Sequence, residues 1–205
     1  MTRRDDIARW DDAAADFDEA ADHGLRAPDV RAAWRELLLT RLPPPPSRVA
    51  DLGCGTGTLS VLLAEAGHRV DGVDFSPEMV RRARAKADES GVATTGARFV
   101  VGDAAAPPLR GASYDVVLCR HVLWAIPDPS AALRAWAGLL APGGRLVLVE
   151  GRWSTGGGLG AAETVALVRA AGREASLTVL PQRHYWGREI DDERYVVVSG
   201  GPLDR

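Results

Sequence analysis

Three glycines at alternate positions follow a short apolar run in the segment RVADLGCGTGTLS, residues 48–60. Gly53, Gly55 and Gly57 allow a tight turn and let a ligand approach the backbone closely. The helix predicted directly after them offers free N–H groups and the positive end of its dipole. We therefore expect this loop to bind a small anionic or dipolar ligand.

Acidic residues recur at the ends of the predicted strands around this loop. Asp74 lies 21 residues after Gly53 (74 − 53), where a carboxylate can accept both hydroxyls of a ribose. Asp51 precedes the first glycine and could help to hold an ammonium group. Asp103, in FVVGDAAAPPL, could accept from an exocyclic amine such as that of adenine. A ligand with an amine, a ribose and an adenine would satisfy all three.

A nicotinamide dinucleotide is the alternative ligand for a glycine-rich loop of this kind. The spacing here is G-x-G-x-G, and Thr58 stands where a dinucleotide fingerprint has its third glycine. Asp51 would also repel a pyrophosphate. Both features argue against that alternative.

The elements that must position these residues alternate between strands and helices after PPPP, residues 43–46. This order predicts right-handed βαβ units in an α/β, doubly wound, mostly parallel sheet. Before the prolines, residues 1–42 are predicted to form a helical arm, and residues 47–200 to form the main domain. We expect strands over 48–52, 70–74, 98–101, 114–119, 145–150, 174–180 and 194–199, and helices over 58–66, 77 onward, 129–140 and 159–171.

In such sheets, ligands bind beyond the carboxyl ends of the strands. The three acids, the glycine loop, residues 120–124 and residues 151–160 all follow strands and therefore share one rim. Residues 184–186 join them if the strand before them is parallel. His68 precedes a strand and belongs on the opposite rim.

Five segments together resemble the class I S-adenosylmethionine-dependent methyltransferases: VADLGCGTGTLS, VDGVDFSPEMV, FVVGDAAAPPL, YDVVLCRHVLWAIPDP and LLAPGGRLVLVE. They occur in that family's order and at its distances, over residues 49–150. The resemblance implies a Rossmann-like, seven-stranded sheet whose last strand is antiparallel, and S-adenosylmethionine as cofactor, with S-adenosylhomocysteine as product. It implies cofactor contacts at Asp51, Gly53, Cys54, Gly55, Gly57, Asp74, Phe75, Met79, Asp103, Ala104 and Arg120.

Methyl transfer from a sulfonium is an in-line displacement that needs alignment and exclusion of water. A general base is needed only where the nucleophile must lose a proton. His121, just past the fourth strand, is the first candidate for that base, and His23 in the arm is the second. Both have a structural alternative: His121 at the edge of the cofactor site, and His23 as a polar cap ahead of Gly24.

Aromatic residues on the predicted rim suggest a pocket for an apolar or ring-bearing acceptor. Trp34 and Trp136 fit the apolar stripes of helices, so we expect both in the core. Trp10 and Phe17 resemble the aromatic-Asp pattern of a lid helix over the cofactor. The residues expected to contact the acceptor are Trp124, Trp153, His184, Tyr185 and Trp186.

Composition narrows the function further. A net charge of −3 disfavours nucleic acid as a partner. The rim acids already have cofactor roles, so no metal is expected. Cys54 and Cys119 suit free thiols in a reducing compartment, and the N-terminus carries charge where a signal peptide needs an apolar stretch. We therefore expect a cytoplasmic protein with no membrane-spanning segment.

The sequence thus predicts a methyltransferase acting on a small molecule. The alternative is a binding module for S-adenosylmethionine or a nucleoside that does not catalyse, or a partner subunit. The acceptor, the attacked atom and the oligomeric state stay open.

Overall fold

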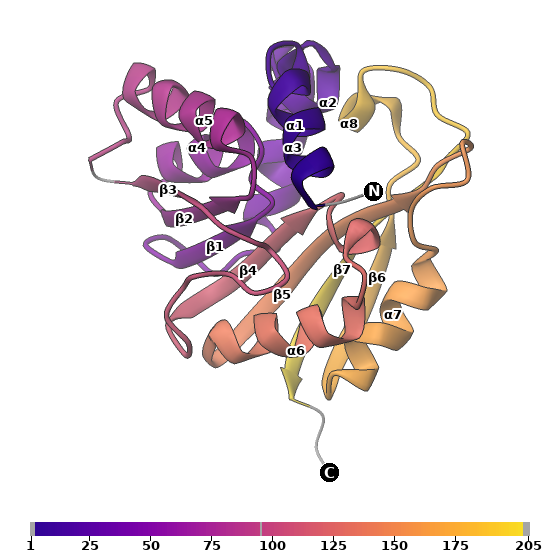
Figure 1. Cartoon of the computed structure of the whole chain (residues 1–205). Coiled ribbons are helices and arrows are strands. Elements are labelled where there is room, and N and C mark those ends of the chain that lie inside the picture. The colour runs from indigo at the N-terminus through magenta and orange to yellow at the C-terminus, as the bar shows by residue number, and fades with distance from the viewer. Residues whose placement is uncertain (1–2, 95, 203–205) are drawn as a thin grey trace.

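A computed structural model describes residues 3–94 and 96–202 and contains a seven-stranded sheet in the order β3-β2-β1-β4-β5-β7-β6 (Figure 1). The strands are β1 (Arg48–Leu52), β2 (Arg69–Asp74), β3 (Ala97–Val101), β4 (Tyr114–Arg120), β5 (Leu140–Arg152), β6 (Arg173–Val179) and β7 (Glu193–Pro202). Strands β1 to β5 pair in parallel, and β7 is antiparallel to both β5 and β6. The predicted α/β fold, with its antiparallel last strand, is confirmed.

Helices cover both faces of this sheet. Figure 1 shows α4 (Thr58–Glu65) and α5 (Pro77–Glu89) on one face, and α6 (Pro129–Leu139) and α7 (Ala161–Ala170) on the other. Adjacent strand residues alternate between the two cores: Val49 packs with the α4 and α5 side and Ala50 with the α6 and α7 side. This period of two is the geometry that a strand buried on both faces requires.

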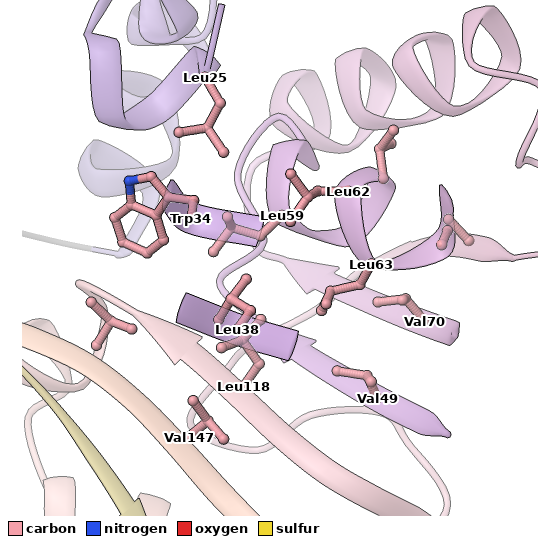
Figure 2. Packing of buried hydrophobic residues seen from close by; sticks show 14 of the residues in the cluster. Leu25, Trp34, Leu38, Val49, Leu59, Leu62, Leu63, Val70, Leu118 and Val147 are labelled. Carbon is pink, nitrogen blue, oxygen red and sulfur yellow. The ribbon is translucent and has the colours of Figure 1, made fainter. Parts of the chain in front are cut away.

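The N-terminal arm is helical but interrupted. It comprises α1 (Arg3–Ala13), the 3-10 helix η1 (Phe17–Glu19), α2 (Ala21–Gly24) and α3 (Pro28–Leu39). Helix α3 is amphipathic and buries Trp34, which joins the core beside Leu38 and Leu59 (Figure 2). The prediction of Trp34 and Trp136 as core residues is confirmed, because neither side chain is exposed.

Capping residues set the helix starts near the sheet rim. Ser76 caps α5, its Oγ accepting from the amide of Met79 at 3.1 Å, and Pro77 occupies the first turn. Asp128 caps α6 in the same way, accepting from Ala131 at 2.8 Å. The short elements η2 (Leu123–Ala125) and α8 (Arg183–Trp186) complete the rim.

The fifth strand is longer than predicted. The expected bounds were 145–150, but β5 begins at Leu140, because Leu140 pairs with Tyr114 before the register shifts ahead of the pair between Val116 and Arg145. An irregularity of this kind absorbs Pro142 and Gly143, which the sequence pattern suggested as a break.

Candidate active site

A cavity of about 140 Å³ lies beyond the carboxyl ends of β1, β2 and β4. Its walls come from the arm, the glycine loop, the end of β2 and the loop after β4. Twelve of the residues predicted for the site line this cavity: His23, Asp51, Gly53, Cys54, Gly55, Asp74, Phe75, Met79, Ala104, Arg120, His121 and Trp124. Segments up to about a hundred residues apart in the sequence therefore meet at one point of the rim.

The glycine loop turns back toward β2. The amides of Gly53 and Cys54 both donate to the carbonyl of Val73, at 2.7 and 3.0 Å. The tight turn thus uses these two amides to join β1 to β2. A side chain at Gly53, which has φ +73°, would place its Cβ 2.3 Å from Val122, so here glycine permits close packing.

Gly57 also serves structure rather than the cavity lining. It caps α4 with φ +76°, and a Cβ there would lie 2.8 Å from that of Ala83. Gly57 does not line the cavity, so its predicted contact with a cofactor is not supported. The close approach of α4 to α5 explains the glycine instead.

Asp74 holds the end of β2 against the glycine loop. Its Oδ2 accepts from the amide of Gly55 and its Oδ1 from that of Ser76, both at 2.9 Å. Burial raises the pKa of this carboxyl, and the two amide hydrogen bonds oppose the rise. Each oxygen keeps further capacity to accept, as two ligand hydroxyls would require.

Asp51 and Arg120 bring opposite charges to the same cavity. Asp51 is buried, accepts from Ser60 Oγ at 2.6 Å, and has its pKa raised by burial to about 6. The Arg120 guanidinium lies 5.2 Å from the Trp34 ring and donates to the carbonyl of Asp22. Such a pair suits the ammonium and carboxylate of a free amino-acid group.

Asp103 does not share this cavity. Its carboxylate forms an ion pair with Arg3 of the arm and accepts from the amide of Ala105 at 2.9 Å. It lines a second cavity of about 540 Å³, which shares Phe75, Ala104 and three other residues with the first. Of the three predicted acids, Asp51 and Asp74 therefore line the first cavity, whereas Asp103, paired with Arg3, lines the adjoining one.

The two candidate histidines both face the first cavity. Neither ring nitrogen of His121 has a hydrogen-bond partner among the described residues. Burial, with Arg120 and Arg194 nearby, lowers the pKa of His121 well below its usual value. The ring of His23 stacks on Phe17 at 4.3 Å, and its pKa is also lowered by burial and by Arg120. Both imidazoles are therefore suited to be neutral and to accept a proton.

The arm covers this cavity and is anchored beside it. Trp10 and Phe17 line it. Asp11 accepts from Ser76 Oγ and from the amide of Glu78, at the start of α5. Asp18 accepts from Thr56 Oγ1 at 2.5 Å and pairs with Lys86. Sequence reasoning missed both anchors, since acids in a charged arm resemble ordinary solvated residues.

Four of the predicted acceptor residues lie outside the cavity lining: Trp153, His184, Tyr185 and Trp186. For the last three residues, the reason is the packing of α8 against α3. Trp186 is buried 5.5 Å from the Trp34 ring, Trp34 Nε1 donates to the carbonyl of Tyr185 at 2.7 Å, and His184 is exposed. Trp153 and Trp186 instead flank His121, at 5.3 and 6.0 Å between ring centroids.

Three further features concern metal binding, membrane spanning and the cysteines. Within residues 3–94 and 96–202, no group of three or more His, Cys, Asp or Glu side chains is placed to hold a metal ion. Over the same ranges, no helix is both long and apolar enough to cross a membrane. Cys54 and Cys119 are free, and burial raises the pKa of each thiol well above its usual value.

Comparison with known proteins finds a family model and relatives that are similar to part of this chain. A methyltransferase domain model matches residues 50–148. The ubiquinone biosynthesis O-methyltransferase of Xanthomonas axonopodis pv. citri is 43% identical over 113 residues, which are 55% of this chain and 46% of that protein. The chain thus spans about half the length of the curated relatives it matches.

Solved structures agree on the fold. Magnesium protoporphyrin IX methyltransferase from Synechocystis, with bound S-adenosylhomocysteine, is 25% identical with a TM-score of 0.67, covering 83% of this chain and 81% of that one. The [4+2]-cyclase SpnF is 21% identical with a TM-score of 0.74, covering 84% and 81%. At that identity the second likeness concerns the fold alone.

Proposed function

We propose that this chain, whose residues 50–148 form a class I S-adenosylmethionine-dependent methyltransferase domain, transfers a methyl group to a small-molecule acceptor. S-adenosylmethionine is the cofactor of this family. The observation that carries the proposal is the single cavity in which Asp74, Asp51, Arg120 and His121 meet. Three of these residues would bind the cofactor, and His121 would accept the proton of the acceptor.

The residues present fit this cofactor. The Asp74 carboxylate is held by two amides and can still accept the ribose hydroxyls. Asp51 and Arg120 would receive the ammonium and carboxylate of the methionine portion. Phe75 and Met79 would contact the adenine, which extends toward the cavity that Asp103 lines. The first cavity, at about 140 Å³, is smaller than ligand sites usually are, so the whole cofactor would also occupy the second cavity.

When bound, the cofactor supplies an electrophilic methyl carbon on a sulfonium. His121 accepts the proton that the acceptor loses as its nucleophile attacks. A neutral imidazole with no protein partner is free to do this. The Xanthomonas relatives are named as O-methyltransferases, which supports an oxygen nucleophile. Val122 and the exposed Trp124 form the apolar wall for a small organic acceptor.

The arm acts as a lid in this proposal. Trp10 and Phe17 cover the cavity, and Asp11 and Asp18 anchor the arm to α5 and the glycine loop. Closing a lid excludes water from the reacting groups. Entry of the cofactor then requires these anchors to open.

The free cysteines support a reducing compartment, the cytoplasm.

Binding is tested first. Isothermal titration with S-adenosylmethionine and with S-adenosylhomocysteine should show one site per chain. The absence of heat with both ligands, in protein shown to be folded by circular dichroism, would overturn the proposal.

Transfer is tested next, with S-adenosylmethionine labelled in its methyl group. Small phenols, carboxylic acids, amines and activated carbon acids are supplied as separate groups. Label should move to at least one oxygen acceptor. Binding without transfer to any group would favour the second candidate, a domain that binds the cofactor without using it.

A further inference from the structure

Glu150 lies in β5 beneath the loop that follows β4. Its side chain has no exposed surface. One oxygen, Oε1, accepts from the amide of Val122 at 3.1 Å and from that of Leu123 at 2.8 Å. Two successive amides that converge on one oxygen form a backbone nest, and the Glu150 carboxyl fills it from within the protein.

The residue just before this nest has an unusual backbone. His121 has φ +59°, in the left-handed region that residues other than glycine rarely adopt. Such a conformation persists only where the surroundings determine it. The amide of His121 donates to Val149 at 2.9 Å, and the next two amides bind Glu150. The turn at His121 is thus fixed from the neighbouring strand.

The same loop touches the glycine turn. The Val122 side chain packs directly on Gly53, where a Cβ would meet it at 2.3 Å. Trp124 Nε1 donates to the carbonyl of His121 at 2.9 Å. His121, Val122 and Trp124 all line the cavity. The position of one short loop therefore sets three parts of the cavity wall.

We propose that Glu150 is a positioning residue, whose buried carboxyl holds the loop after β4 so that His121 faces the acceptor and Val122 supports the glycine turn. That the acceptor lies at His121 rests on the function proposed above. The hold on the loop does not, since it follows from the contacts of Oε1 alone.

The second oxygen guides the choice of variant. Oε2 has no partner among the described residues, and burial raises the pKa of Glu150 to about 8. The group therefore acts as a neutral acceptor near pH 7. Glutamine keeps this acceptor and the side-chain shape, whereas leucine keeps the volume and removes the acceptor.

The experiment compares Glu150→Gln and Glu150→Leu with the unmodified chain. Ser47→Ala serves as the control for general destabilisation, because it removes a hydrogen bond of another buried side chain, to the carbonyl of Pro44, just ahead of β1 and at the end of the sheet opposite the loop. Amide hydrogen exchange of residues 122 and 123 reports on the loop. Titration with S-adenosylhomocysteine reports on the glycine turn. The kcat and KM for the acceptor found by the labelling assay report on His121.

In Glu150→Leu, we expect exchange of the two amides to rise at least tenfold and kcat to fall at least tenfold. Glu150→Gln should stay within threefold of the original chain in each readout, as should Ser47→Ala in loop exchange. If leucine prevents folding, Glu150→Asn replaces it, because the shorter amide cannot reach the nest.

Unchanged loop exchange in Glu150→Leu would overturn the proposal, as would a glutamine variant as impaired as the leucine one. Failure of the proposed function is distinguishable from this. A chain that binds no cofactor and transfers no methyl group would still show, through the exchange rates, whether Glu150 holds the loop.

Discussion

The Nζ atom of Lys86 lies 2.7 Å from Oδ2 of Asp18, joining the middle of the arm to α5. The same ammonium donates to Thr56 of the glycine loop and to Thr58 at the start of α4, at 3.0 and 2.6 Å. Burial alone would raise the pKa of Asp18, but the hydrogen bonds from Lys86 and Thr56 outweigh it and lower that pKa. One lysine therefore ties together three parts of the chain that surround the cavity.

Replacing Lys86 by methionine should loosen the arm. Asp18 would lose its charged partner while still half-buried, at a cost of about 1 kcal/mol in unfolding free energy. Trypsin cleavage after Arg26 should become severalfold faster, as followed by mass spectrometry. Arg81→Met removes an exposed pair with Glu78 on the same helix and serves as the control. Equal cleavage rates in both variants would argue against the anchoring role of Lys86.

Replacing Asp74 by alanine should weaken S-adenosylhomocysteine binding by at least about thirtyfold. The change removes two acceptors for ribose, each worth about 1.5 kcal/mol or more when charged. Titration calorimetry measures the effect. Asp71→Asn, on the same strand but bonded to Tyr114 outside the cavity, should bind within about threefold of the original chain. A full-affinity Asp74→Ala variant would exclude the ribose role.

Replacing His121 by alanine should lower kcat by about a hundredfold while S-adenosylhomocysteine affinity changes little. Since burial, Arg120 and Arg194 hold the pKa of His121 well below 6.5, the base stays neutral as pH falls from 8 to 6.5, and kcat should be flat over that range. His23→Gln should have the smaller effect, because His23 Nδ1 is engaged by the carbonyl of Phe17 at 3.2 Å. The reverse order of effects would assign the proton transfer to His23.

Glu150 should make the protein less stable as pH rises. Burial raises its pKa in the folded chain to about 8, above the usual 4.5. The protonated carboxyl therefore contributes its full stabilisation below pH 4.5. This stabilisation is lost progressively as the pH rises from 4.5 to 8. The loss is at most about 1.4 kcal/mol per pH unit. Urea unfolding at several pH values should show Glu150→Gln gaining stability relative to the original chain across this window. Parallel curves would mean that Glu150 does not titrate in this way.

The sheet could be predicted almost entirely from local patterns. Apolar runs such as Val116–Cys119, ended by Arg120, mark strands, while Ser76 and Pro77 mark a helix start. These signals are encoded within a few residues. The resemblance between residues 49 and 150 added the antiparallel last strand, which no local pattern predicts.

The site was predictable only where strand order brings residues together. Asp51, Asp74 and His121 lie at or just beyond the carboxyl ends of the neighbouring strands β1, β2 and β4, so the rim rule brought them to one cavity. Asp103 and Tyr185 lie outside the first cavity. Each is contacted by a residue of the distant N-terminal arm, Asp103 by Arg3 and Tyr185 by Trp34. Glu150 was missed for the same reason: its role depends on the amides of a neighbouring strand's loop.

The free cysteines offer a pair of chemical reporters already present in the chain. Cys54 lines the cavity, whereas Cys119 lies in the interior of β4 with no exposed surface. We expect a small thiol reagent to label Cys54 slowly, because burial raises the pKa of its thiol, and to label Cys119 only when the sheet unfolds. The ratio of the two labelling rates would thus separate occupancy of the cavity from loss of the fold, without introducing a single substitution.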